Sequence, residues 1–228
     1  PTNQEVPSYV QVVGSIYKNS DPSDIAVTAA GGLVGEVIQV WRPRELNTHE
    51  TEWGFSCMSY EISGALGIKM ANPDKEVISF IGDGSYLLNN SDIYSSVITN
   101  NKLIIIVCDN GGFAVINRLQ LFKGGNEYNN LLKSSNTPGL VDVDFAKHAE
   151  SMGAKSEHVN SISDLEEAFK RAKKSDVTYV ISIKTHAYQW LEGSAFWDSP
   201  TLEIPTTKEN KEALKLYKEG KNKQRQGV

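Results

Sequence analysis

The sequence predicts an α/β protein built on a three-layer, doubly wound parallel sheet. Two observations lead to this fold class. Short apolar runs alternate along the chain with longer amphipathic stretches, which is typical of strand–helix–strand units. The most hydrophobic run, residues 103–108, is apolar almost throughout, as in strands that helices cover on both faces.

Five segments have the composition of strands. Each is a short run rich in Val, Ile, Ala or Phe, and most of them end near glycine or another turn-forming residue. The expected strands are residues 24–30, 77–81, 103–108 and 177–183, with a shorter one at 154–159.

Three segments have the periodicity of helices. Residues 58–70 carry apolar side chains at four-residue steps, and residues 163–174 place apolar side chains on one face and charges on the other. Ser163 and Glu166 fit a capping box at the start of the second helix. Residues 208–224 are expected to form a charged, solvated helix.

The composition excludes several classes of protein. There are 23 Lys and Arg against 28 Asp and Glu, and the net charge of −5 is unlike the basic surface of a nucleic-acid-binding protein. An apolar fraction of 39% allows a sizeable core, but the longest apolar run is too short to cross a bilayer. Cys57 and Cys108 lie in apolar stretches and make no disulfide framework, so a reducing, cytoplasmic compartment is expected.

Residues 1–205 are expected to form one domain, and residues 206–228 a charged helical tail. The polar segment 124–139 is rich in Gly, Asn and Ser and is predicted to be a long functional or mobile loop. The chain begins at Pro1, without a signal peptide. We therefore expect a processed product or a piece of a longer protein.

Three of the expected strands end in turns that are rich in glycine and polar residues. Ligands of open parallel sheets lie beyond the carboxyl ends of the strands, so these turns are the candidate site. Because two strands joined by one crossover become neighbours, Asp83 and Asn110 are expected to lie close together. The turns are Ala30-Gly31-Gly32, Gly82-Asp83-Gly84-Ser85 and Asp109-Asn110-Gly111-Gly112.

An anion and a metal ion together fit the second and third turns. The turn at residues 82–85 opens a helix, and the backbone amides at a helix N-terminus favour phosphate. Asp83 would repel a bare phosphate, but Mg²⁺ between the two removes the repulsion. The amide oxygen of Asn110 and the carbonyl oxygen of Gly112 are further ligands that Mg²⁺ prefers. Each turn alone is a weak signal, and their positions on consecutive strands make the combination specific.

Motifs for other phosphate and metal chemistry are missing from the sequence. It contains no P-loop, and no G-x-G-x-x-G follows a strand. The four histidines do not have the spacing of a zinc site, and there is no G-x-S-x-G nucleophile motif. The residues therefore favour a Mg²⁺-bridged phosphate site over these alternatives.

The turn at residues 82–85, followed by a helix, a strand and Asp109-Asn110, resembles the cofactor motif of thiamine-diphosphate enzymes. The resemblance implies a fold that binds thiamine diphosphate, with Asp83, Asn110 and the Gly112 carbonyl as Mg²⁺ ligands. It also implies that Gly84 and Ser85 contact the diphosphate.

Residues 54–59 resemble the segment before the long helix in the acetolactate-synthase-like branch of the family. The resemblance implies that the Met58 side chain wedges beneath the cofactor and bends it into a V. It also implies that the backbones of Ser56 and Met58 contact the aminopyrimidine ring. Plain core packing is the alternative role of Met58. The predicted cofactor-binding residues are Gly31, Gly32, Ser56, Met58, Gly82, Gly84, Ser85 and Asn110.

Five stretches are similar to the branch of the family that opens a cyclic 1,2-dione by hydrolysis in myo-inositol catabolism. This similarity covers nearly the whole chain, but only the carboxyl-terminal third of such an enzyme. It implies that the cofactor attacks a ketone carbon of the dione and that water then opens the ring. The stretches are residues 29–33, 52–61, 109–120, 195–198 and the charged tail that ends at 223–225.

The family also implies which parts lie outside these 228 residues. The Glu that activates the cofactor is expected in the pyrimidine-binding domain of a partner subunit, within a homodimer or homotetramer. Glu52 and Glu61 lie near the motif, but nothing marks either of them as that Glu, so no catalytic residue is assigned to this chain. We expect the chain alone to bind the diphosphate end of the cofactor weakly and to turn nothing over.

Three alternatives stay open at this stage: a lyase or decarboxylase of the acetolactate-synthase type, a non-catalytic binding module, and one subunit of a split enzyme. His49 and His186 are weaker candidates for contacts with substrate. Trp190 and Trp197 are weaker candidates for covering the site, because large aromatic side chains near a terminus more often anchor it to the core.

Overall fold

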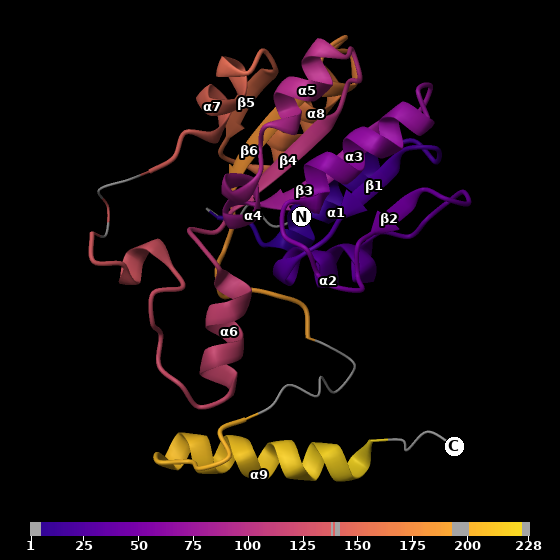
Figure 1. The fold of residues 1–228 in the computed structure, drawn as a ribbon. Helices are drawn as coiled ribbons and strands as arrows, with labels where there is room; N and C mark the ends of the chain where they lie inside the picture. Colours follow the sequence, from indigo (N-terminus) through magenta and orange to yellow (C-terminus); the bar gives the residue numbers. More distant parts are fainter. Residues whose placement is uncertain (1–5, 138, 140–141, 193–200, 225–228) are drawn as a thin grey trace.

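The structure, a computed structural model, describes residues 6–137, 139, 142–192 and 201–224. A six-stranded sheet lies at its centre, with helices on both faces (Figure 1). Every described strand pair is parallel, and the strand order is β2-β1-β3-β4-β6-β5. This confirms the predicted fold class. The strands are β1 (Ile25–Thr28), β2 (His49–Thr51), β3 (Val77–Gly82), β4 (Ile104–Asp109), β5 (Lys155–Val159) and β6 (Tyr179–Lys184).

The helices form the two outer layers. One face of the sheet packs against α1 (Tyr9–Asn19), α2 (Gly31–Val40) and α8 (Ile162–Lys173). The other face packs against α3 (Tyr60–Ala71), α4 (Asp83–Leu88), α5 (Asp92–Ile98) and α7 (Phe145–Ser151). Two more helices, α6 (Ala114–Phe122) and α9 (Lys208–Lys223), lie beyond the carboxyl edge of the sheet (Figure 1).

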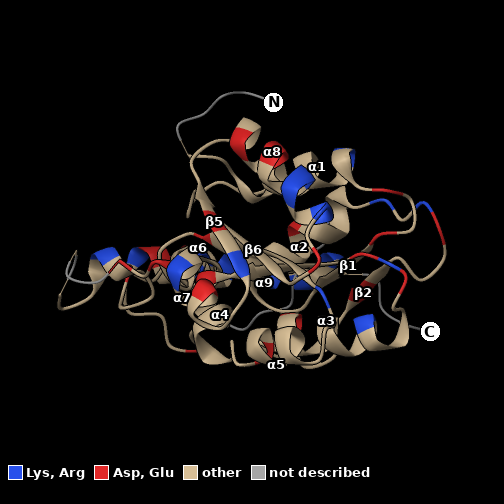
Figure 2. Cartoon of the chain, turned by 90° about the horizontal axis from the view of Figure 1, so that it is seen from above, with Lys and Arg blue, Asp and Glu red and all other residues tan. Residues whose placement is uncertain are grey.

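The side chains of β4 explain why this strand is apolar throughout. Ile104, Ile106 and Cys108 pack toward the α1, α2 and α8 layer. Ile105 and Val107 pack toward the opposite layer, because successive side chains of a strand point to opposite faces. Charged residues lie mainly on the outer helices and loops, and few lie on the central strands (Figure 2).

The strand order places a crevice at the end of β1. From β1 the chain passes through α2 to β2 on one side, and it returns through α3 to β3 on the other side. The connection that follows β1 runs through α2 on one face of the sheet, and the connection that follows β3 runs through α4 and α5 on the other face, so the two diverge. Such a reversal of strand order is where open α/β sheets bind their ligands.

The structure adds elements that the sequence patterns did not predict. Strand β2 is three residues long, lies at the sheet edge and is incompletely buried, so it lacks the apolar run that marks a buried strand. Helix α1 begins with a capping box between Ser8 and Gln11. The segment 124–139 is a loop with one short 3₁₀ turn, η1 (Leu132–Ser134), in its described part.

Two local predictions were wrong. The N-cap of α8 is Ser161, whose side chain accepts a hydrogen bond from the Asp164 amide, so Ser163 lies inside the first turn and forms no capping box. The helix begins earlier because the Ile162 side chain packs into the core. Cys57 is exposed in the loop after β2 and not in apolar surroundings.

The tail helix α9 is mostly exposed, and only Asn210 and Ala213, in its first two turns, are buried. The Asn210 side-chain nitrogen donates to the carbonyl oxygens of Lys123 and Gly124, at 3.3 and 2.7 Å. A Cβ atom at Gly124 would lie 2.5 Å from the Glu209 backbone, so this contact needs glycine. Among the described helices, none is long and apolar enough to cross a membrane.

Candidate functional site

A pocket of about 230 Å³ opens at the carboxyl edge of the sheet, where β1, β3 and β4 end. All ten residues that the sequence predicts to hold the cofactor or the metal line it. The structure thus brings together turns that lie far apart in the chain. These residues are Gly31, Gly32, Ser56, Met58, Gly82, Asp83, Gly84, Ser85, Asn110 and Gly112.

Two buried oxygen atoms in this pocket have no hydrogen-bond partner in the described structure: Oδ1 of Asp83 and Oδ1 of Asn110. Asp83 is the first residue of α4 and is 4% exposed, and Asn110 directly follows β4. Buried polar atoms nearly always have partners, so two exceptions in one pocket indicate a ligand. Carboxylate and amide oxygens are donors that Mg²⁺ prefers.

The pKa of Asp83 shows how unfavourable its carboxylate is without a cation. Burial, followed by the negative charge of Asp109, raises the pKa of Asp83 to about 7. The backbone amides of Gly112, Asn110 and Gly84 oppose this rise without cancelling it. A divalent cation beside the carboxylate would remove the penalty, so the residues present fit a metal ion. No group of three His, Cys, Asp or Glu side chains gathers in the described residues.

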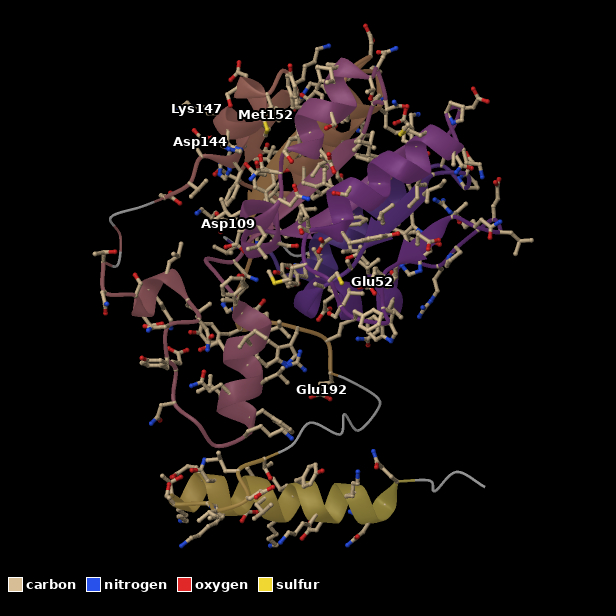
Figure 3. All side chains as sticks on the ribbon, viewed as in Figure 1. Glu52, Asp109, Asp144, Lys147, Met152 and Glu192 are labelled. Carbon is tan, nitrogen blue, oxygen red and sulfur yellow. The ribbon has the colours of Figure 1, made fainter. Side chains whose placement is uncertain are left out.

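Asp109, the last residue of β4 (labelled in Figure 3), has a different role from Asp83. One oxygen of its carboxylate lies 2.6 Å from the Lys184 ammonium nitrogen, and the other accepts a hydrogen bond from the Gly111 amide at 3.0 Å. Lys184 also pairs with Asp142 at 2.7 Å. Asp109 therefore holds the turn that presents Asn110 and is paired with a lysine that it shares with Asp142.

Glu61 joins the connections that surround the pocket. It is 1% exposed in the first turn of α3. Its carboxylate accepts hydrogen bonds from the Ala30 amide, at 3.3 Å, and from the Ser85 hydroxyl, at 2.9 Å. That hydroxyl in turn accepts a hydrogen bond from the Ser59 amide, at 2.6 Å. Burial raises the pKa of Glu61.

These contacts refine the prediction for Ser85. Its hydroxyl is engaged with Glu61 and Ser59, so its backbone amide is the group left for a ligand. No role for Glu61 was predicted from the sequence. The sequence does place this glutamate beside apolar residues at the start of a predicted helix. That position could have indicated a buried carboxylate, which needs hydrogen-bond partners.

The loop that carries Met58 is held in shape by Glu52. The Glu52 carboxylate accepts hydrogen bonds from two backbone amides within the loop, at 2.9 and 2.6 Å. Ser56 and Ser59 both have positive φ angles, of 51° and 74°, which non-glycine residues adopt only where the surroundings impose them. The loop places the partly buried Met58 in the wall of the pocket.

An apolar wall faces the glycine turns. A Cβ atom at Gly84 would lie 2.5 Å from the Phe113 ring, so a side chain at this position would displace that ring. Gly112 has a φ of 136°, and a Cβ atom there would lie 2.5 Å from the Asn130 carbonyl oxygen. Gly112 therefore requires glycine, and any side chain at Gly84 would have to move the Phe113 ring.

Tyr9 is a residue of the pocket that the sequence patterns missed. It lies on α1, 101 positions before Asn110, and its hydroxyl accepts a hydrogen bond from the Asn110 side-chain nitrogen. Burial, with the negative charge of Asp83 among the further causes, raises the pKa of Tyr9 well above its ordinary value. No local motif marks such a residue, because only the packing of α1 against the sheet brings it to the site.

The weaker candidates divide among three places. His186 and Trp190 line a small side pocket that shares Tyr9 and Asn110 with the main one. The Trp190 ring stacks under the guanidinium of a helix α6 arginine at 4.2 Å, as an anchoring aromatic would. His49 lies in β2, contacts Thr51 and lines neither pocket. Trp197 lies outside the described residues.

Comparison with known proteins agrees with this geometry. Residues 29–183 match the family model described as "Thiamine pyrophosphate enzyme, C-terminal TPP binding domain". A relative from Bacillus licheniformis named 3D-(3,5/4)-trihydroxycyclohexane-1,2-dione hydrolase is 36% identical over 90% of this chain and 32% of its own length. A relative of the same name from Clostridium tetani is 37% identical over 82% of this chain and 30% of its own length. The chain thus spans about a third of the length of the curated relatives it matches.

A solved structure shares the fold. The thiamine diphosphate-dependent 4-hydroxybenzoylformate decarboxylase of Rhodococcus jostii RHA1 superposes with a TM-score of 0.69 at 20% identity. The match covers 82% of this chain and 34% of that one. The family resemblance that the sequence motifs predicted is confirmed: the chain belongs to the thiamine pyrophosphate enzymes and carries their C-terminal TPP binding domain.

Proposed function

We propose that this chain is the cofactor-binding part of a thiamine-diphosphate- and Mg²⁺-dependent hydrolase that cleaves a carbon–carbon bond of a cyclic 1,2-dione in myo-inositol catabolism. The unpartnered, buried oxygens of Asp83 and Asn110 carry the cofactor half of the proposal, because they lie in the region that matches the family. The printed names of the relatives supply the substrate class. A cytoplasmic location belongs to the same proposal.

In this proposal the chain's own groups hold the metal and the diphosphate. Oδ1 of Asp83, Oδ1 of Asn110 and the Gly112 carbonyl bind Mg²⁺. The amides of Gly84 and Ser85 bind the diphosphate, and the other glycines of the pocket let it approach the backbone closely. When bound, the cofactor supplies the electron sink for carbon–carbon bond cleavage, with Mg²⁺ neutralising its diphosphate.

The loop that holds Met58 supports the ring end of the cofactor. Because Glu52 fixes this loop through two backbone amides, the loop does not have to become ordered when Met58 and the Ser56 backbone contact the cofactor. Phe113, Val115 and other apolar side chains of α6 and the turn before it line the opposite wall and exclude water from the pocket. Met58 is therefore assigned to the cofactor, and not to the core.

Neither glutamate near the motif is free to activate the cofactor. Glu61 accepts hydrogen bonds from Ala30 and Ser85, and Glu52 holds its own loop. This supports an activating Glu in the pyrimidine-binding domain of a partner subunit, within a homodimer or homotetramer. Exposed apolar side chains beside the pocket fit such a covering domain: Phe55 is 89% exposed, Trp53 62% and Phe113 42%.

The first test is calorimetric titration of the chain with thiamine diphosphate, with and without Mg²⁺. We expect binding heat that needs Mg²⁺ and that Asp83→Ala abolishes, because this substitution removes the only acidic ligand of the proposed metal site. Glu167→Ala, which removes an exposed carboxylate on α8, serves as the control and should bind as the unchanged chain does. Heat that is independent of Mg²⁺ or survives Asp83→Ala would contradict the metal assignment.

The second test uses the stability of the chain without ligand. The pKa of Asp83 is about 7 in the folded chain, against about 3.9 in an unfolded one. The folded state therefore keeps a proton that the unfolded state has lost, and stability falls as the pH rises from about 4 to about 7. Asp83→Asn removes this fall, so above about pH 7 its Tm should exceed that of the unchanged chain by roughly 5 °C or more, and near pH 4 the two should converge.

Ligand should change the Tm values of the two proteins in the opposite direction, by stabilising the unchanged chain and not Asp83→Asn. Mg²⁺ with inorganic pyrophosphate should raise the Tm of the unchanged chain and leave that of Asp83→Asn where it was, because only the carboxylate gains from the cation. Parallel pH profiles of the two proteins in thermal melts would show that Asp83 is not a buried, uncompensated acid.

A third prediction concerns Glu61. Glu61→Ala leaves the Ala30 amide and the Ser85 hydroxyl without their acceptor, at a cost of about 1–3 kcal/mol each. Because these groups belong to the connections that hold the cofactor, affinity for thiamine diphosphate in the same titration should fall about tenfold or more. Glu61→Gln, which keeps the size of the side chain and one acceptor oxygen, should lose less. Equal affinity in all three proteins would remove Glu61 from the site.

A fourth prediction concerns turnover. The chain alone should not open 3D-(3,5/4)-trihydroxycyclohexane-1,2-dione at saturating cofactor and Mg²⁺, because the activating Glu of this proposal belongs to another domain. A chimera in which it replaces the matching C-terminal third of the Bacillus licheniformis relative should open the ring, and Asp83→Ala in that chimera should not. Turnover by the isolated chain, or a chimera that only decarboxylates 2-keto acids, would falsify the assignment.

A further inference from the structure

Tyr9 lies at the proposed metal site without offering the metal a ligand of its own. We propose that its hydroxyl is a positioning group, which holds the Asn110 side chain so that the amide oxygen, and not the nitrogen, faces the cation. This inference rests on the proposed function, because it concerns how the chain prepares one of its own residues for Mg²⁺.

The chemistry of an asparagine side chain creates the need for such a group. The oxygen and the NH₂ of the amide have nearly the same shape, but only the oxygen binds a cation. An amide that gives its oxygen to a metal still has two N–H groups to place in a buried pocket. In this structure the Tyr9 hydroxyl accepts one of them, and the Asn110 oxygen is left buried and unpartnered.

Helix α1 presents Tyr9 rigidly. Ser8 and Gln11 form a capping box at the start of the helix, and the Pro7 carbonyl accepts a hydrogen bond from the His186 amide at 2.9 Å. One turn further on, Val12, Val13 and Ile16 are fully buried in the core. The hydroxyl is therefore fixed relative to the ends of the central strands.

The position of α1 in the chain makes this role distinctive. The family model matches residues 29–183, so Tyr9 lies outside the matched domain. The glycines of the matched turns lie next to it: a Cβ atom at Gly82 would lie 3.9 Å from the Tyr9 hydroxyl, and one at Gly32 would lie 3.9 Å from its ring, both at ordinary van der Waals distance. The ring thus fills space, and the hydroxyl adds a specific contact with Asn110.

The test separates the hydroxyl from the ring. Tyr9→Phe keeps the packing and removes only the acceptor for the Asn110 amide. With Mn²⁺ in place of Mg²⁺ and inorganic pyrophosphate present, the paramagnetic resonance of free Mn²⁺ reports the metal affinity directly. We expect Tyr9→Phe to weaken Mn²⁺ binding about tenfold or more, as loss of a group that orients a metal ligand does. Tyr17→Phe, which removes a hydroxyl from the other end of α1, should have no effect.

A double-variant cycle excludes a merely structural role. In Asn110→Asp the side chain presents an oxygen in either orientation and has no N–H to place. Tyr9→Phe should therefore cost no metal affinity in the Asn110→Asp background. An equal loss in both backgrounds would overturn the proposal, because general loosening of the pocket would not depend on which residue occupies position 110.

The remaining outcomes are distinct. Unchanged Mn²⁺ affinity in Tyr9→Phe, with normal binding by the unsubstituted chain, would overturn the role of Tyr9 and leave the proposed function intact. Failure of the unsubstituted chain to bind Mn²⁺ with pyrophosphate would overturn both. A thermal melt in metal-free buffer shows that each variant is folded before its affinity is compared.

Discussion

The buried carboxylate of Asp83 is the constraint around which the site is organised. The sheet places it at the end of β3, and among the described ion pairs none reaches it. Asp109, the acidic residue whose charge raises the pKa of Asp83, is paired with Lys184, which also pairs with Asp142. Because Lys184 pairs with Asp109 and not with Asp83, no cation in the described residues compensates the negative charge of Asp83, which is left for an external cation.

Three side chains hold the loops and the ligand-binding groups around Asp83 in place, and they leave few atoms of their own for a ligand. Glu61 joins the connection after β1 to the turn after β3, Glu52 fixes the loop of Met58, and Tyr9 engages Asn110. The glycine turns contribute backbone groups, which have no rotamers to order. These polar side chains thus make the site rigid, and the proposed contacts with ligand come largely from the backbone and from two side-chain oxygens.

How far the sequence predicted this site depends on whether each signal was local. The glycine turn at residues 82–85 and Asn110 can each be recognised from a few neighbouring residues. The alternation of strands and helices implies that the strands before them end side by side. These positions were therefore predicted correctly to lie in one pocket. Tyr9 reaches the same pocket from 101 positions away through the packing of one helix, which no motif encodes. Strand β2 was missed because a three-residue edge strand has no buried run, and the cap of α8 was misplaced because core packing of Ile162 decided where that helix starts.

The same distinction fits the proposal that this chain binds the cofactor and that another domain supplies the activating base. The donors proposed for metal and diphosphate all come from the ends of strands in one sheet, and a single folded domain can assemble them. Glu52 and Glu61 are already bound to backbone or hydroxyl groups, and freeing either one would loosen the loops it holds. In the proposed enzyme, a base for the ring end of the cofactor must therefore enter from another domain, across the exposed apolar side chains of Phe55 and Trp53. In that enzyme, this chain binds the cofactor and the other domain activates it, and the contact between the two domains brings the two functions together.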